Sequence, residues 1–213
     1  FRVELVASEP MVKDPVFVDW DDEGRMWVGE LRTYMRDLDG TGENERMSRV
    51  MVLEDKDKDG IMDKATPFVD DMINVRCIAF VDDGVLVVES GALWLCKDND
   101  GDLRCDEREK LIDFASAAHS NIEHAENALH YGLDNWMYNS KSSRKLAWRR
   151  GKLIEMPAKG RGQWGMASDA YGRLYFNANS NWFEVDWATY DRQWPSKSST
   201  CLLYTSDAAD DVR

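Results

Sequence analysis

Apolar and polar positions along the chain form one arrangement that occurs four times. In each copy, an apolar run leads through a short acidic or polar turn into a second run rich in Trp, Tyr, Val or Leu. The four copies span residues 16–28, 78–88, 128–138 and 164–176. Two such runs joined by turn residues predict a β-hairpin, because side chains in a strand alternate between its two faces. We therefore expect four hairpins of one type.

Shorter apolar runs between these hairpins predict further strands. They lie at residues 49–53, 93–95, 110–114, 145–148 and 152–155. A repeat of roughly 40–60 residues made only of strands is typical of propeller blades, which contain four strands each. The predicted fold class is therefore all-β: a β-propeller fragment with about four blades of a six- or seven-bladed ring. A β-sandwich is the competing architecture, but its strands follow one another every 8–12 residues or so without a long repeat.

The two ends of the chain suggest a piece of a longer protein. Residues 201–213 resemble the translation of an adapter used in sequencing libraries. We expect this segment to be a non-native tail that is not part of the fold. Residues 1–200 are then a partial β-propeller domain. Helical periodicity is weak throughout, and its best candidate is the short segment 115–128.

Composition narrows the class of protein. Hydrophobic residues make up 43% of the chain and aromatic residues 11%, which excludes intrinsic disorder for most of its length. Lys and Arg number 27 against 40 Asp and Glu, for a net charge of −13. Such an acidic chain is a poor partner for nucleic acid or for an anionic membrane. No apolar run approaches the length of about 20 residues that a transmembrane helix needs.

An acidic loop near residue 60 has the pattern of a calcium site. Asp55, Asp57 and Asp59 alternate, a Gly follows them, and Asp63 stands three residues after that Gly. Calcium prefers several oxygen ligands, and a tight loop can direct alternate carboxylates at one point. An EF-hand would require Glu at the twelfth position, where this chain has Thr66, so the motif is not a complete EF-hand. A solvated acidic turn between two outer strands is the alternative.

A second acidic loop contains Asp98 and Asp100 and predicts a weaker calcium site. When residues 98–101 are aligned with residues 57–60 of the first loop, Cys96 stands where the first Asp of the motif would be. Three later acidic residues could supply oxygens in its place: Asp102, Asp106 and Glu107.

Cysteines before the tail are Cys77, Cys96 and Cys105, and none of them belongs to a zinc or haem attachment motif. Cys96 and Cys105 flank the second acidic loop. They could form a disulfide in an oxidising compartment, and two buried free thiols fit the sequence equally well.

The three histidines, His119, His124 and His130, lie close together in the sequence. His is the side chain best suited to accept a proton near neutral pH, and the neighbouring carboxylate of Glu123 could tune its basicity. A metal site of His119, His124 and Glu126 is a second interpretation, although its spacing matches no known zinc motif. Polar histidines on a loop at a blade edge are the third.

Several segments resemble the membrane-bound dehydrogenase propellers of planctomycetes and verrucomicrobia. They are residues 1–10, 55–63, 127–136 and 161–174, and the resemblance covers residues 1–195. It implies an exported, extracytoplasmic or periplasmic protein. Members of that family are often fused to helical repeats and to a c-type haem domain, so the resemblance implies a c-type cytochrome domain as a partner.

A more distant resemblance is to the soluble sugar dehydrogenases that use pyrroloquinoline quinone (PQQ) and fold as six-bladed propellers. In those enzymes, an acid–His pair precedes a hairpin with Gly, Asp and Tyr at fixed distances. The matching residues here are Glu123, His124, Gly132, Asp134 and Tyr138. A quinone-contacting Arg stands four residues before the Gly of a later hairpin, which is the position of Arg161 relative to Gly165.

The resemblance implies a quinone-dependent dehydrogenase that passes electrons from a sugar or alcohol towards a c-type cytochrome. His124 would be the base that removes the substrate's hydroxyl proton, and Arg161 would polarise the quinone oxygens. The spacers between the motifs differ from those of the sugar dehydrogenases. The alternative function is a non-catalytic propeller that binds a carbohydrate or a protein and serves as a scaffold.

Overall fold

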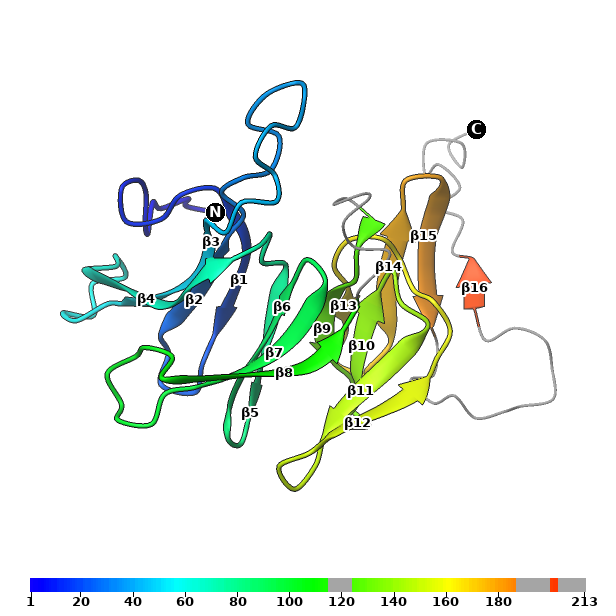
Figure 1. The fold of residues 1–213 in the computed structure, drawn as a ribbon. Helices are drawn as coiled ribbons and strands as arrows, with labels where there is room; N and C mark the ends of the chain where they lie inside the picture. Colours follow the sequence, from blue (N-terminus) through cyan, green and yellow to red (C-terminus); the bar gives the residue numbers. More distant parts are fainter. Residues whose placement is uncertain (115–123, 187–199, 203–213) are drawn as a thin grey trace. The chain divides into compact units, whose positions relative to one another are not determined.

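Antiparallel β-strands make up the regular structure of the protein in the computed structural model (Figure 1). The structure describes residues 1–114, 124–186 and the backbone of 200–202. Within these residues there is no α-helix, and hence none that could cross a membrane. The chain divides into two units, residues 1–125 and 126–213, which are described separately below.

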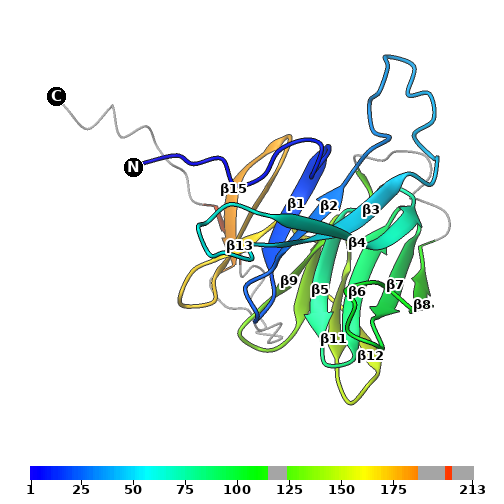
Figure 2. The same cartoon turned by 90° about the vertical axis from the view of Figure 1, so that its left-hand side faces the viewer.

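Unit 1 contains two four-stranded sheets, formed by β1–β4 and by β5–β8. The strands of the first sheet are β1 (Pro15–Trp20), β2 (Met26–Glu30), β3 (Ser48–Glu54) and β4 (Lys64–Met72). Those of the second are β5 (Cys77–Val81), β6 (Gly84–Glu89), β7 (Ala92–Lys97) and β8 (Glu107–Asp113). In both sheets each strand pairs antiparallel with the next one in the sequence, and Figure 2 shows β5 to β8 side by side in that order.

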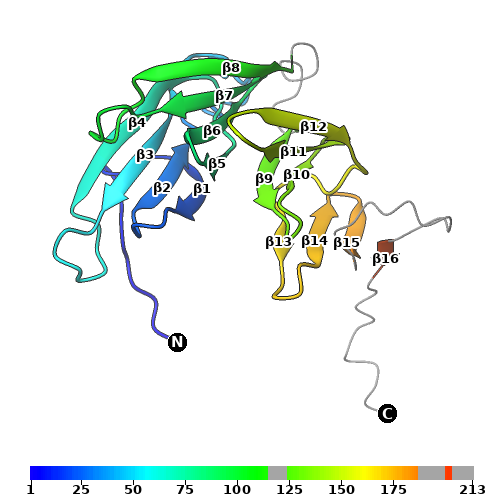
Figure 3. The same ribbon diagram turned by 90° about the horizontal axis from the view of Figure 1, so that it is seen from below.

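Unit 2 has the same organisation. The strands of its first sheet are β9 (Asn127–Tyr131), β10 (Met137–Ser140), β11 (Arg144–Trp148) and β12 (Leu153–Pro157). Those of its second sheet are β13 (Ala167–Ser168), β14 (Leu174–Ala178), β15 (Asn181–Asp186) and β16 (Thr200–Leu202). Consecutive strands again pair antiparallel, as Figure 3 shows for β9 to β12. The all-β prediction is confirmed, and each of the four predicted hairpins forms the first two strands of a sheet.

An Asp at the start of the hairpin turn explains why two of these hairpins form alike. Its carboxylate accepts hydrogen bonds from the Arg four residues later and from the aromatic side chain six residues later. The two sets are Asp21, Arg25 and Trp27 in β1–β2, and Asp169, Arg173 and Tyr175 in β13–β14. The Asp therefore fixes the turn and also orients an aromatic residue of the second strand.

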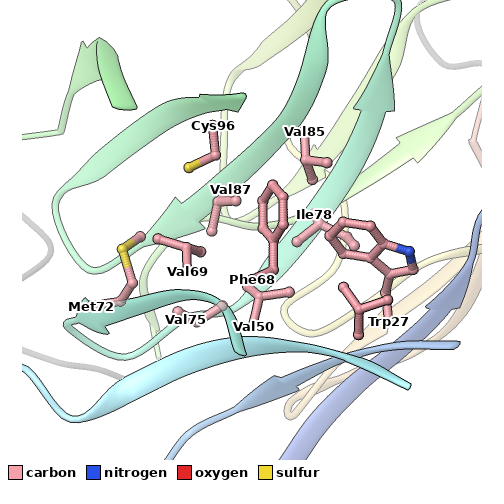
Figure 4. Packing of buried hydrophobic residues seen from close by; sticks show 11 residues of the cluster. Trp27, Val50, Phe68, Val69, Met72, Val75, Ile78, Val85, Val87 and Cys96 are labelled. Atoms are coloured by element: carbon pink, nitrogen blue, oxygen red, sulfur yellow. The ribbon is translucent and has the colours of Figure 1, made fainter. Parts of the chain in front are cut away.

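The core of unit 1 lies between its two sheets (Figure 4). Trp27 packs edge-on against Phe68 of the same sheet and Phe80 of the other, with ring centroids 4.7 and 5.2 Å apart. Valines of β3 and β6, together with Cys96 of β7, complete this cluster. Burial of such side chains contributes roughly 1.5–3 kcal/mol each, so this contact holds the two sheets together.

Unit 2 has a smaller core of Tyr138, Leu174 and Phe176. Buried Asn127 contributes polar contacts: its amide donates to the carbonyl of Gln163 at 2.7 Å, and its oxygen accepts from the N–H of Gly165 at 3.0 Å. These bonds connect β9 to the segment that leads into β13.

Strands β4, β15 and β16 were not predicted, and Cys201 and Leu202 of β16 belong to the segment expected to be a non-native tail. In β4 the apolar alternation is interrupted by Pro67 and by Asp70 and Asp71, yet the strand pairs along β3 with shifts in register. The strand β16 pairs with β15 at Thr200–Leu202, and the rest of the tail lies outside the described residues. The helical candidate at 115–128 is largely outside them too, and its last residues belong to β9.

Candidate functional site

Two acidic loops connect the third and fourth strands of the two sheets of unit 1. The first runs from Asp55 to Asp63, between β3 and β4, and the second from Asp98 to Asp106, between β7 and β8. Both loops extend beyond the ends of their strands (Figure 1). The predicted cation ligands therefore lie at the same connection of two adjacent sheets.

The first Asp of each loop holds the backbone in place. The Asp55 carboxylate accepts from the N–H groups of Lys58 at 2.7 Å and Gly60 at 2.9 Å. The Asp98 carboxylate accepts from the N–H groups of the residues three and five positions further on, also at 2.7 and 2.9 Å. The two loops therefore begin with the same pair of hydrogen bonds.

The last Asp of each loop closes it. Asp63 accepts from the N–H of Lys56, and Asp106 accepts from the N–H of Asn99, both at 2.7 Å. The middle of each loop carries one more shared bond, from an N–H to the Asp carboxylate two residues earlier. Its pairs are Asp59 with Asp57 and Asp102 with Asp100. Every residue of the second loop thus has a counterpart in the first at a constant offset in residue number.

Both loops use left-handed backbone at the same two places. In the first loop these positions are Lys58, with φ 63°, and Gly60, with φ 92°. Their counterparts are Gly101, with φ 83°, and Leu103, with φ 66°. Left-handed backbone costs a non-glycine residue about 1–2 kcal/mol, so each loop has one relaxed and one strained position, in opposite order.

The structure corrects the sequence alignment of the second loop. Asp98, and not Cys96, takes the place of the first Asp. Cys96 lies within β7 and corresponds to Leu53 at the end of β3. The alignment failed because it superposed the two glycines, which occupy different positions of the same backbone. The Asp spacing, which is identical in the two loops, was the signal that would have given the correct register.

Three carboxylates come together in each loop, with one oxygen of each within 4.8 Å of the others. The groups are Asp55, Asp57 and Asp63, and Asp98, Asp100 and Asp106. Asp59, a predicted ligand, is not in its group, and its carboxylate accepts from the N–H of Ile61 at 2.7 Å. Asp106 joins its group, although the sequence offered it only as a substitute ligand.

Basic side chains balance the first loop more than the second. Lys56 donates to Glu54 and lowers the pKa of that carboxyl, and Lys64 lies 3.0 Å from the same carboxylate. At the positions that correspond to Lys56, Lys64 and Glu54, the second loop has Asn99, Glu107 and Lys97. Carboxylates held close together with little counter-charge repel one another, and a bound cation would offset this repulsion.

His124, the predicted proton acceptor, is exposed, while His119 and Glu123 lie outside the described residues. Glu126 is mostly buried, which raises its pKa, and it pairs with Arg144 at 3.3 Å. Among residues 1–114 and 124–186, the groups with metal-binding spacing do not include His124 or Glu126.

Arg161, the predicted quinone contact, is buried within unit 2. Its Nε donates to Asp186 at 2.5 Å, and its Nη1 donates to the carbonyl of Lys159 at 2.9 Å. The guanidinium also lies over the ring of Tyr138, 4.6 Å from the centroid. With its charge directed at Asp186, Arg161 does not fit direct contact with quinone oxygens in this arrangement.

The hairpin residues of the PQQ resemblance do come together. The hydroxyl of Tyr138 donates to Asp134 at 2.7 Å. A Cβ at Gly132 would lie 2.7 Å from Asp134 and 2.8 Å from the Tyr138 ring, so the contact requires Gly there. Within residues 124–186, none of the hydrogen bonds of this group reaches His124. The structure thus assembles the hairpin part of the motif without joining it to the predicted base.

The sequence matches a known protein family. Residues 1–210 match the family described as "Domain of unknown function (DUF7133)". None of the curated proteins matches the chain. Because the match covers nearly the whole sequence, the chain belongs to the DUF7133 family.

Proposed function

We propose that this chain is part of a β-propeller that works as a calcium-dependent binding scaffold, with one calcium ion in each acidic loop of unit 1. The observation that carries the proposal is the shared hydrogen-bond pattern of Asp55–Asp63 and Asp98–Asp106. Two sequences that differ at most of their other positions keep the same four Asp residues and the same backbone.

Electrostatics favours a cation at this place. Two unit charges 4 Å apart repel by about 1 kcal/mol in water and more where solvent is scarce. Each loop keeps three carboxylates within 4.8 Å while backbone N–H groups fix their positions. Calcium accepts irregular sets of oxygen ligands, whereas magnesium demands near-octahedral geometry, so calcium is the ion that we propose.

The repeated four-stranded sheets support the propeller. Each is an antiparallel meander in sequence order, and the two sheets of unit 1 pack through a shared apolar core. Propeller blades have this organisation. Spin labels on β8 and β12 test the proposal, because adjacent blades in a ring give a single narrow distance distribution between the units. A broad distribution would contradict it.

The effect of calcium on the unfolding temperature tests whether the acidic loops bind calcium. Millimolar calcium is expected to raise the unfolding temperature, because a ligand that binds only the folded state stabilises it. Asp57→Asn and Asp100→Asn each remove one charge but keep an acceptor oxygen, and each is expected to reduce the shift. Asp22→Ala, which removes an exposed carboxylate from the β1–β2 turn, is the matched control and should keep the full shift. No shift in the unsubstituted protein would overturn the proposal.

The quinone-dependent dehydrogenase is the second candidate, and the assembled Gly132, Asp134 and Tyr138 favour it. We assign no step to the quinone, because Arg161 is held by Asp186. The test is reduction of an electron-accepting dye by the chain with PQQ, calcium and a panel of sugars and alcohols. Activity that is lost in His124→Ala would support the dehydrogenase function. Absence of quinone binding would favour the non-catalytic scaffold.

A further inference from the structure

The constant offset between the acidic loops also pairs the side chains beneath them. Under the first loop lie Leu53, which is fully buried, and Met62, which is partly buried, and both belong to one apolar cluster. Their counterparts are Cys96, also fully buried, and Cys105, partly buried, and these belong together to the core of unit 1. Figure 4 shows Cys96 in that core. The two positions that hold apolar side chains beneath the first loop therefore hold thiols beneath the second.

The two thiols are free and in contact. The S–H of Cys96 donates a hydrogen bond to the sulfur of Cys105, and the S–H of Cys105 donates to the carbonyl of Glu107 at 3.1 Å. Cys96 is fully buried, whereas Cys105 is partly exposed. The pair therefore consists of one accessible thiol and one thiol that is protected by burial, and access controls which of them reacts first.

The accessible thiol lies in a pocket. Cys105 lines a pocket of about 400 Å³ between β4 and the start of β8. Two basic side chains, Arg104 and Arg108, line the same pocket together with the acidic Asp70, Asp71 and Asp106. The N–H of Cys105 donates to the carbonyl of Phe68 at 2.7 Å, which holds its backbone on β4. A small disulfide entering the pocket would meet Cys105 first.

We propose that Cys96 and Cys105 are a redox-active pair whose reversible disulfide closes the second acidic loop. The Cys105 thiolate attacks one sulfur of a small-molecule disulfide, such as oxidised glutathione, and one thiolate leaves. The released thiolate takes the proton of Cys96, and the Cys96 sulfur attacks the Cys105 sulfur, releasing the second thiolate. Two protein thiols are oxidised, one small disulfide is reduced, and the released thiolates account for both electrons.

The disulfide would secure the loop without a cation. A covalent link between Cys96 and Cys105 holds together the two ends of the segment that carries Asp98, Asp100 and Asp102. At the corresponding positions the first loop has the apolar side chains of Leu53 and Met62, which form no covalent link. The proposal is independent of calcium binding, because it concerns the thiols beneath the loop and not its carboxylates.

The test uses the full chain with Cys201→Ser, which leaves Cys77, Cys96 and Cys105. The protein is treated with oxidised glutathione, remaining thiols are alkylated, and peptides are mapped by mass spectrometry. We expect a Cys96–Cys105 disulfide, with Cys77 alkylated only after denaturation because it is buried. In Cys96→Ser, a glutathione adduct should accumulate on Cys105, and in Cys105→Ser the rapid reaction should be lost.

The first loop provides the matched control. Leu53→Cys with Met62→Cys, in the Cys96→Ser and Cys105→Ser background, should gain a disulfide if the shared backbone brings these positions together. Oxidation of the original pair should slow amide hydrogen exchange in residues 98–106 and leave residues 55–63 unchanged. The proposal is overturned if the thiols of the folded, unsubstituted pair do not react, or if Cys96 reacts as fast as Cys105.

Discussion

The two acidic loops of unit 1 have one backbone but different charges. The Lys residues in and beside the first loop have uncharged or acidic counterparts in the second. These pairs are Lys56 and Asn99, Lys58 and Gly101, and Lys64 and Glu107. The second loop gains Arg104, which lies 4.0 Å from Asp102, and Lys97 in place of Glu54. Residues 97–107 then have two basic residues against five acidic ones, whereas residues 54–64 have three against five. We therefore expect the second loop to bind a cation more tightly, the reverse of the order that the sequence motifs predicted.

This difference shows which residues determine the loop. The glycines change places between the loops, and the residues between the Asp positions change charge, yet the backbone stays the same. What both loops keep is the four Asp residues and the N–H groups that they accept from. The carboxylates thus act as the framework of the loop.

Removal of the first Asp of either loop should have the largest effect on stability. Asp98→Ala and Asp55→Ala each remove an acceptor of two backbone N–H groups, and we expect a loss of about 2 kcal/mol in each case. Asn at the same position keeps an acceptor and should lose about half as much. Urea unfolding measures these values, and a change as small as that of Asp22→Ala would contradict the framework role.

Substitutions at the left-handed positions should have the next largest effect on stability, and this effect should differ between the two loops. Gly60→Ala and Gly101→Ala should each cost about 1–2 kcal/mol through backbone strain alone, since a Cβ at either site meets no atom within 4 Å. Lys58→Gly should stabilise the protein by up to about 1 kcal/mol because it relieves strain. Leu103→Gly should bring no gain, because Leu103 packs against the core of unit 1.

The control for this set is Lys56→Gly, at a position without left-handed backbone. Thermal unfolding should show destabilisation there and stabilisation in Lys58→Gly. Equal effects of the two substitutions would contradict the assignment of strain to residue 58.

Exchange of one charge between the loops should change calcium affinity moderately. Asn99→Lys should weaken binding in the second loop by roughly fivefold, and Lys56→Asn should strengthen it in the first by a similar factor, from about 1 kcal/mol per charge pair. Calorimetric titration of each variant measures the change. Affinities that do not respond to these substitutions would argue against electrostatic control.

The smallest expected effect concerns Glu54, which the second loop replaces with Lys97. The hydrogen bond from Lys56 and the charge of Lys64 lower its pKa below the ordinary 4.5. A lowered pKa adds stability above the unfolded-state value, and this is lost as the pH falls through the folded-state pKa. Lys56→Asn should raise the Glu54 pKa in an NMR titration, and its cost in stability should disappear in acid.

Sequence periodicity predicted the fold class and most strands because turn residues and apolar runs are local signals. Strand β4 was not predicted because Pro67 and the Asp70–Asp71 pair interrupt its alternation of apolar and polar residues. Its pairing with β3 depends on contacts between residues that are distant in sequence. The relative placement of sheets depends on packing such as that of Trp27 with Phe80, which no local pattern encodes.

The site was predicted in part. The alternating Asp residues identified both loops, since side-chain spacing is a local property. The predicted register of the second loop was wrong because Gly101 was aligned with Gly60. In the structure, Leu103 occupies the position equivalent to Gly60. The burial of Arg161 against Asp186 could not be foreseen, because the partner lies on a strand that the sequence did not predict.

The most direct test of the central claim is calorimetric titration of calcium into the full chain and into Asp57→Asn, Asp100→Asn and the double variant. We expect two sites in the unsubstituted protein, the tighter one lost in Asp100→Asn and the weaker one in Asp57→Asn. The double variant should give no binding heat, while a magnesium titration should show much weaker binding throughout. Absence of calcium binding to the unsubstituted chain, or unchanged binding in the double variant, would contradict the account.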